Sequence, residues 1–341
     1  MKERLLALDA LRGIAALGIA LFWHYSHFLP NQEVLFPCWF SFHGWLLVDF
    51  FFVLSGFIFS YVYLEKIRTK KISFKEFITS RIARLYPLYF ITLCFVSAMQ
   101  AINFFLTESF FVYALNDVPH FLLSLCMLFG SNFSFNGPAW SISCEMGAYI
   151  LFFATLFYFS KSRIPIYVAI ITTALTLGYF NTEWMRALIG FFVGCIAFEL
   201  RSKMKPFWLL ILSIMLAIFF KDVGKKAILL YSFLLFPSLI LTVLNSKILS
   251  SILSIKPLVF LGTISYSIYL WHFPLQLTIN VLDNLLTLKL NYLSPTFFAT
   301  YALTLCAVAT LSHHLLEKPA MHLKNKLLSR KTAIDFKQKY E

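Results

Sequence analysis

The sequence predicts an all-α, polytopic membrane protein with about ten transmembrane helices and both termini in the cytoplasm. Hydrophobic residues make up 60% of its 341 residues and charged residues only 13%, whereas about a quarter of a soluble domain is charged. The apolar residues form runs of membrane-crossing length, and Lys and Arg cluster in short stretches between these runs, as they do in cytoplasmic loops. The net charge of +13 therefore indicates basic loops beside membrane lipids, and we expect no nucleic-acid partner.

The hydropathy pattern places the spans in order along the chain. The predicted spans are residues 7–29, 43–64, 85–105, 138–160, 164–180, 185–200, 207–220, 226–244, 257–280 and 295–316. Residues 106–137 include an apolar piece too short to span, so we expect an interfacial or re-entrant segment on the outer side. Three lysines at positions 221, 225 and 226 lie on the outer side in this order, against the basic-inside rule.

The predicted domain organisation is simple. Residues 1–325 are expected to form a single membrane domain, and residues 326–341 a short basic cytoplasmic tail. Asp9 and Arg12 interrupt the first apolar run, so we interpret it as a retained span rather than a signal peptide. The expected location is the inner or plasma membrane of the cell.

The first span carries ionisable residues that a plain anchor would lack. Such residues are costly in a membrane and usually face the protein interior or a water-filled cavity. Asp9 and Arg12 are three positions apart and could pair across a turn; such a pair could equally set the depth of the helix. His24 could act as a base or be a core histidine bonded to a backbone carbonyl, and His27 is a rival base.

One face of this span is formed by small side chains that lead to His24. Gly13, Ala16, Ala20 and His24 fall within roughly 60° around a helix that turns about 100° per residue. Either a thin ligand chain or a close-packed neighbouring helix could lie along this stripe.

Three later blocks also place polar groups in apolar surroundings. Arg81 and Arg84 are one turn apart where a basic loop meets the third span, and arginine forks bind phosphates well, although basic-inside anchoring explains much of the pattern. Glu145 is a lone carboxylate near the start of an apolar helix, stabilised by the helix dipole or by a partner side chain. The ninth span carries hydroxyls and an imidazole on one helix, an arrangement that an interfacial aromatic belt explains poorly; these residues are Ser265, Tyr266, Tyr269 and His272.

Together these blocks resemble the acyltransferase-3 family of membrane acyltransferases. The resemblance rests on six blocks. Two are apolar runs, residues 8–16 with a later histidine and residues 51–57. The other four are an R-x-x-R-x-x-P pattern (Arg81, Arg84, Pro87), a W-S-x-S-x-E block (Trp140, Ser141, Ser143, Glu145), an S-Y-x-x-Y-x-x-H block (Ser265, Tyr266, Tyr269, His272) and a closing E-x-P (Glu317, Pro319). The set covers almost the full length. In the family pattern the histidine follows the arginine of the first helix by eleven positions, whereas His24 follows Arg12 by twelve.

The resemblance implies ten core helices and transfer of an acyl group, commonly acetyl, from cytoplasmic acyl-CoA to a hydroxyl of a cell-surface or secreted glycan, including a lipid-linked sugar. Acyl-CoA is then a co-substrate, and neither a bound cofactor nor a metal is expected. In the implied site His24 is the base, Glu145 orients or charge-balances it, Arg12, Arg81 and Arg84 hold the CoA phosphates, and the pantetheine arm follows the small-residue stripe. The acceptor side or its support comprises Asp9, Ser143, Tyr266, Tyr269 and His272.

Two other functions fit the same residues. A transporter or flippase of anionic or lipid-linked substrates could use the arginines and Glu145 as a pathway, and it would consume no acyl-CoA. An enzyme acylating a small molecule or an amino group would differ only in its acceptor.

Overall fold

The computed structural model describes residues 3–29, 33–128, 135–159, 161, 163–177, 182–204, 206–219 and 227–321, and these ranges contain helices and no strand. The longer elements, in chain order, are α1 (Leu6–Gly18), α3 (Leu47–Arg68), α4 (Phe74–Thr107), α6 (Trp140–Tyr158), α7 (Arg163–Leu177), α8 (Thr182–Leu200), α9 (Pro206–Phe219), α11 (Phe236–Asn245), α13 (Lys256–Leu286) and α14 (Pro295–Ser312). The short helices are α2 (Trp39–His43), α5 (Val118–Leu125), α10 (Ala227–Leu230) and α12 (Lys247–Leu253). The predicted all-α class is therefore confirmed.

Each of the ten predicted spans overlaps a helical segment of the described residues, but not all of these segments are long and apolar enough to cross a membrane by themselves. Seven segments meet that standard: Leu6–Phe28, Trp39–Arg68, Phe74–Thr107, Gly137–Tyr158, Ile228–Asn245, Lys256–Leu286 and Pro295–Met321. Helices α7 and α9 are apolar but shorter. The chain is thus a multi-pass membrane protein, and the count of ten spans stays a prediction.

The third span begins earlier than predicted. Helix α4 starts at Phe74 rather than at residue 85, because Ser73 and Glu76 form a reciprocal capping box that satisfies the first backbone N–H groups. Pro87 lies inside this helix, as transmembrane helices tolerate when neighbours satisfy the freed carbonyl. Arg81 and Arg84 therefore project from a regular helix, and the expectation that the helix begins only after both of them, at residue 85, was wrong.

The first span changes its helical form between its arginine and its histidine. Helix α1 continues into a π-helical turn, Ile19–Trp23, and then into a 3₁₀ turn, His24–Phe28. A π turn accommodates one residue more than an α turn. The turn can therefore accommodate the one-residue difference between the spacing of Arg12 and His24 and the eleven-position spacing of the family pattern.

The small-residue stripe of α1 is filled by protein. A Cβ atom built on Gly13 would lie 2.5 Å from the backbone nitrogen of Gly262, and one on Gly262 would lie 2.0 Å from the Asp9 carbonyl oxygen. Ala16 and Ala20 are fully buried in a cluster with α13 residues. Helix α13 thus occupies the stripe, because only glycine lets two helix backbones approach so closely. The expectation that a pantetheine arm lies along it was wrong.

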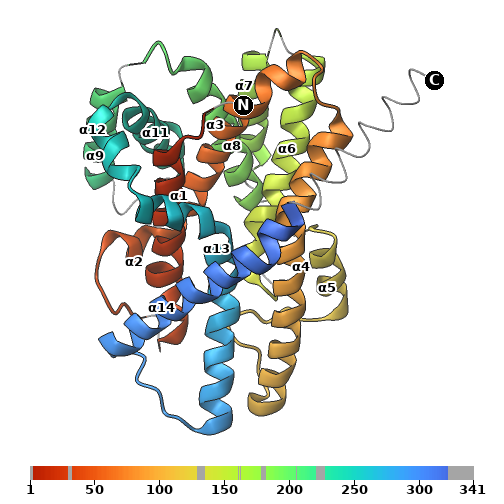
Figure 1. The fold of residues 1–341 in the computed structure, drawn as a ribbon, viewed down its shortest axis with the longest axis vertical. Helices are drawn as coiled ribbons and strands as arrows, with labels where there is room; N and C mark the ends of the chain where they lie inside the picture. The colour runs from red at the N-terminus through yellow and green to blue at the C-terminus, as the bar shows by residue number, and fades with distance from the viewer. Residues whose placement is uncertain are drawn as a thin grey trace, which may run out of the picture.

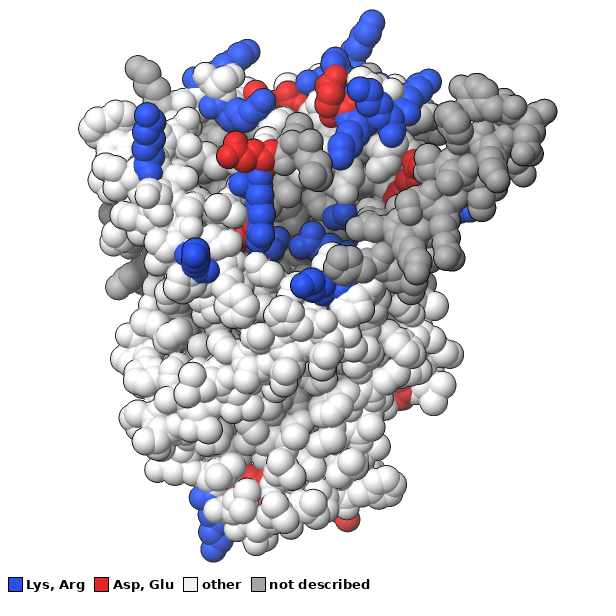
Figure 2. All heavy atoms as spheres, viewed as in Figure 1, with Lys and Arg blue, Asp and Glu red and all other residues white. Residues whose placement is uncertain are grey.

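Charge divides the molecule along its long axis. Lys and Arg gather at the end where the N-terminus lies, and an uncharged band follows below it (Figures 1 and 2). The segments Phe74–Thr107 and Pro295–Met321 are the least buried of the seven, with 28% and 22% of an 18-residue apolar stretch buried, as expected for helices that face lipid. Helix α14 crosses α13 obliquely (Figure 1).

Two predictions concern residues that the structure describes in part or not at all. In the region 106–137, α5 is an eight-residue helix, which agrees with a segment too short to span. The lysines at 221, 225 and 226 and the predicted tail, 326–341, lie outside the described residues.

Candidate active site

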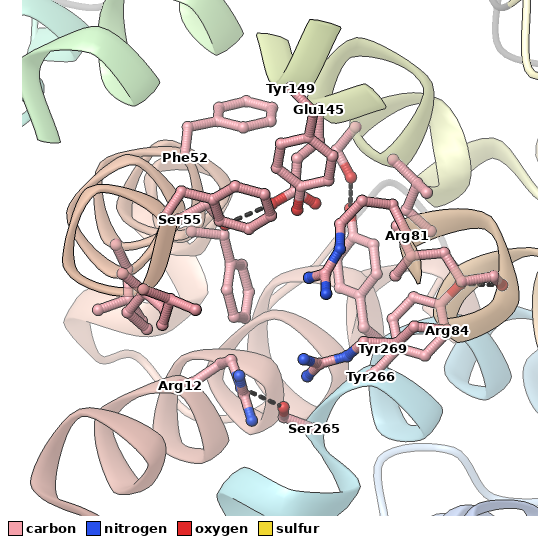
Figure 3. Close-up of a pocket in the computed structure, with 18 of the residues that line it drawn as sticks. Arg12, Phe52, Ser55, Arg81, Arg84, Glu145, Tyr149, Ser265, Tyr266 and Tyr269 are labelled. Atoms are coloured by element: carbon pink, nitrogen blue, oxygen red, sulfur yellow. Dashed lines mark hydrogen bonds between the residues drawn. The ribbon is translucent and has the colours of Figure 1, made fainter. Parts of the chain in front are cut away.

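A cavity of about 290 Å³ lies among α1, α3, α4, α6 and α13, and we call it the arginine cavity (Figure 3). It is lined by Arg12, Phe51, Phe52, Leu54, Ser55, Ile58, Phe59, Val62, Tyr63, Arg81, Arg84, Leu85, Ser141, Ile142, Glu145, Tyr149, Ser265, Tyr266 and Tyr269. Figure 2 shows Lys and Arg in and above a recess near the charged end of the molecule. Residues of five of the six sequence blocks thus meet here, although the blocks are far apart in the chain, and only the closing E-x-P block is missing from the lining.

The three arginines of this cavity are held in different ways. Arg12 donates to the Ser265 hydroxyl at 3.0 Å and to the Gly262 carbonyl at 2.7 Å, and Asp9 lies 3.2 Å from its guanidinium. The guanidinium of Arg81 donates to the Tyr63 hydroxyl at 2.6 Å. Arg12 and Arg81 are therefore positioned before any ligand binds.

Arg84 differs from the other two. Within the described residues it has no hydrogen-bond or ion-pair partner, and its guanidinium points into the shared space (Figure 3). A guanidinium presents five donors in a fixed fork that suits phosphate and carboxylate oxygens. Arg84 is thus the arginine with the most capacity left for an anionic ligand.

Glu145 lies in the same cavity and not beside His24. It accepts a short hydrogen bond from the Ser55 hydroxyl of α3. Three guanidinium groups face one carboxylate here, so the cavity favours an anion. The expectation that Glu145 orients or charge-balances His24 is not supported by this placement, because the two residues line different cavities.

A second cavity, of about 500 Å³, contains His24, and we call it the histidine cavity. Its lining combines aromatic rings with a few polar groups: Ile19, Trp23, His24, Trp45, Val48, Tyr113, Gly137, Pro138, Trp140, Thr182, Glu183, Arg186, Ile228 and Tyr269. Such a mixture is typical of sites for small organic ligands.

A chain of hydrogen bonds fixes the protonation of His24. Nδ1 of His272 lies 2.6 Å from the Tyr269 carbonyl oxygen, which can only accept, so neutral His272 carries its proton on Nδ1. Its Nε2 is then an acceptor, 2.7 Å from Nδ1 of His24. His24 therefore donates through Nδ1, and within the described ranges no group forms a hydrogen bond with the lone pair of its Nε2. This is the arrangement of a general base oriented by a second group.

His27 stands behind His24 rather than in the cavity. The two rings stack with centroids 4.8 Å apart, and Nδ1 of His27 lies 3.1 Å from the Gln276 side-chain oxygen. The Gln276 amide donates to the His24 carbonyl at 2.8 Å. Because His24 lines the cavity and His27 does not, the geometry favours His24 as the base.

An ion pair that was not predicted from the sequence lies beside the histidine cavity, which Arg186 lines. Arg186 contacts both carboxylate oxygens of fully buried Asp49, at 3.1 and 2.7 Å, and donates to the Trp45 carbonyl at 2.8 Å. Its guanidinium lies 5.3 Å from the ring centroids of Trp45 and Trp140. Both charges sit inside predicted spans, and this was the signal that could have identified them.

The remaining predicted residues take supporting places. Asp9 bridges Arg4, at 2.5 Å, and Arg12. Tyr266 lines the arginine cavity and donates to the Leu85 carbonyl at 2.6 Å. Ser143 is buried on α6 and lines neither cavity.

Comparison with known proteins agrees with the arrangement of these motifs. A family model described as an acyltransferase domain, Acyl_transf_3, matches residues 5–313. The chain belongs to the acyltransferase-3 family. Residues 5–313 therefore form an acyltransferase domain, and the resemblance noted from the motifs is confirmed.

Several curated relatives are similar over most of the chain. O-acetyltransferase OatA of Staphylococcus aureus (strain NCTC 8325 / PS 47) is 27% identical over 80% of this chain and 51% of its own length. The putative peptidoglycan O-acetyltransferase YrhL of Bacillus subtilis (strain 168) is 26% identical over 92% of this chain and 54% of its own length. The chain thus spans about half the length of these relatives. No solved structure matches it.

Proposed function

We propose that this protein is a membrane O-acyltransferase that moves an acetyl group from a CoA thioester to a hydroxyl of a cell-surface or secreted glycan. The observation that carries the proposal is the fixed orientation of His24, whose free Nε2 belongs to a residue that lines a ligand-sized cavity. The names of the relatives, O-acetyltransferase and putative peptidoglycan O-acetyltransferase, support acetyl as the group and a cell-wall glycan as the acceptor class.

The donor belongs in the arginine cavity. Its three guanidinium groups against one carboxylate suit the phosphates of CoA, and Arg84 has no competing partner among the described residues. The basic end of the molecule is on the cytoplasmic side by the basic-inside rule, where acyl-CoA is found. Arg12 lies on the first span nearer that end than His24.

The acceptor belongs in the histidine cavity. The faces of a sugar ring pack against aromatic side chains, and Trp23, Trp45, Trp140 and Tyr113 supply such rings. His24 is about 18 Å from Arg12 along the first span, at 1.5 Å per residue, so the acceptor approaches from the far side of the membrane.

The chemistry then follows from the His24 tautomer. Nε2 of His24 takes the proton of the sugar hydroxyl while the hydroxyl oxygen attacks the thioester carbonyl carbon. The new C–O bond forms, the C–S bond breaks, and the CoA thiolate takes up the proton from the imidazolium. Thioester and alcohol are thereby converted to ester and thiol, and His272 stabilises the imidazolium by accepting from its Nδ1.

Purified protein in liposomes, given acetyl-CoA labelled on the acetyl group and glycan or lipid-linked sugar acceptors, tests this proposal. We expect wild-type protein to label the acceptor and His24→Ala to lose about 10²–10⁴ in rate, the usual contribution of a general base. His27→Ala is the matched control and keeps most of the activity. Equal transfer by wild type and His24→Ala would refute the role of His24, and movement of acceptor with acetyl-CoA intact would instead indicate a transporter.

A further inference from the structure

One residue separates the two cavities. Among the described residues, Tyr269 alone lines both the arginine cavity and the histidine cavity. It projects from the middle of α13, one turn before His272. The side chain of Tyr269 therefore lies where the two cavities adjoin.

The Tyr269 hydroxyl is held by one partner from each cavity. It donates to the Pro138 carbonyl at 2.7 Å and lies 2.9 Å from the Ser141 hydroxyl. Pro138 lines the histidine cavity, and Ser141 lines the arginine cavity. The ring also packs edge-on against Phe51, with centroids 5.9 Å apart, and only 7% of the residue is exposed. The side chain is thus fixed at the boundary between the cavities.

The backbone of the same residue belongs to the catalytic chain of hydrogen bonds. The Tyr269 carbonyl accepts from Nδ1 of His272, and His272 in turn orients His24. Tyr269 therefore lies at the boundary between the cavities and also helps to orient His24, the proposed base, through His272.

We propose that the Tyr269 side chain is the barrier between the donor and acceptor cavities, and that the acyl group crosses at this point when the bonds to Pro138 and Ser141 open. The proposal rests on the proposed function. A closed barrier keeps the thioester away from water in the histidine cavity, where His24 would otherwise direct water onto it. That side reaction breaks the same C–S bond and yields acetate and CoA. An acceptor sugar bound against Pro138 contacts the bond that must open.

The rate at which acetyl-CoA is hydrolysed without transfer to an acceptor measures how well the barrier closes. In proteoliposomes without acceptor, we expect Tyr269→Ala to release acetate from acetyl-CoA about tenfold faster than wild type and to transfer less acetyl when acceptor is added. Tyr269→Phe, which keeps the ring and loses both hydroxyl contacts, gives an intermediate rise of about threefold. The matched control is Tyr89→Phe, which removes a buried hydroxyl bonded to the Ser124 carbonyl at 2.6 Å and leaves the ratio of hydrolysis to transfer unchanged.

Each outcome is decisive. Wild-type rates of hydrolysis in Tyr269→Ala, or loss of transfer without added hydrolysis, would overturn the barrier. If Tyr269→Ala does not accumulate, Tyr269→Phe and Ser141→Ala replace it, because each removes part of the same contact.

Failure of the proposed function would look different, because wild-type protein would then consume no acetyl-CoA at all. The barrier can still be tested in that case with Ile142→Cys, which places a thiol in the arginine cavity. A membrane-impermeant maleimide added from the side of the histidine cavity should label position 142 only when Tyr269 is replaced, as read by mass spectrometry. Equal labelling with Tyr269 present would overturn the proposal.

Discussion

His272 is buried and touches no cavity, yet we expect its replacement to slow catalysis. Its Nε2 accepts from Nδ1 of His24 at 2.7 Å. When His24 takes up a proton, this contact becomes a charge-assisted hydrogen bond, which is worth about 1.5–3 kcal/mol. At about 1.4 kcal/mol per factor of ten in rate, His272→Phe should lower kcat by roughly 10- to 150-fold.

The assay compares two replacements of similar size. His272→Phe keeps an aromatic ring and offers no acceptor, whereas His272→Gln can present a side-chain oxygen to His24. We expect the fall in kcat to shrink to less than about tenfold in His272→Gln, because one hydrogen bond is restored. Rates are measured with labelled acetyl-CoA at saturating acceptor, and thermal denaturation in detergent checks that both variants are folded.

The double variant His24→Ala/His272→Phe tests whether His272 acts through His24. If His272 acts through His24, the double variant is no slower than His24→Ala, because groups that act as a unit are not additive. Additive losses, or equal losses in His272→Phe and His272→Gln, would show that His272 is only a packing residue.

Three further predictions follow from other contacts. Arg84→Ala should raise the KM for acetyl-CoA about tenfold with little change in kcat, since the lost contact is to the bound donor; an unchanged KM in steady-state assays would contradict this. Asp49→Ala should lower the free energy of unfolding by about 3–5 kcal/mol because it leaves the largely buried Arg186 without its carboxylate. The paired change Asp49→Leu/Arg186→Met should recover most of the thermal stability, and a Tm equal to wild type in Asp49→Ala would refute the pairing. Gly262→Ala should lower the Tm, because its Cβ would lie 2.0 Å from the Asp9 carbonyl oxygen and overpacking costs about 1–3 kcal/mol or more; an unaltered melting curve would show that α1 and α13 can separate at no cost.

Much of the fold was predictable because membrane helices satisfy their backbone groups locally. Apolar runs indicate helices whatever their neighbours are, so each predicted span coincides with a helical segment. Helix ends were less predictable. The start of α4 depended on the capping box of Ser73 and Glu76, which lies outside the apolar run that marked the span.

The candidate site was predicted as a set of residues but not as two cavities. Ionisable groups inside apolar runs identified Arg12, His24, Glu145 and His272. Spacing along one helix could not show that Glu145 faces Arg81 and Arg84 while His24 faces Trp45 and Trp140. That partition depends on how α6 packs against α3 and how α13 packs against α1 and α4.

The sequence by itself was enough to show that this protein lies in a membrane, that it is helical and which family it belongs to, because each of these depends on composition or on short motifs. Only the tertiary structure decided which polar groups meet. The contact between His24 and His272 joins residues 248 positions apart, and it exists because Gly13 and Gly262 let α1 and α13 approach closely. The place of Tyr269 between the two cavities is likewise set by the packing of whole helices and not by its neighbours in sequence.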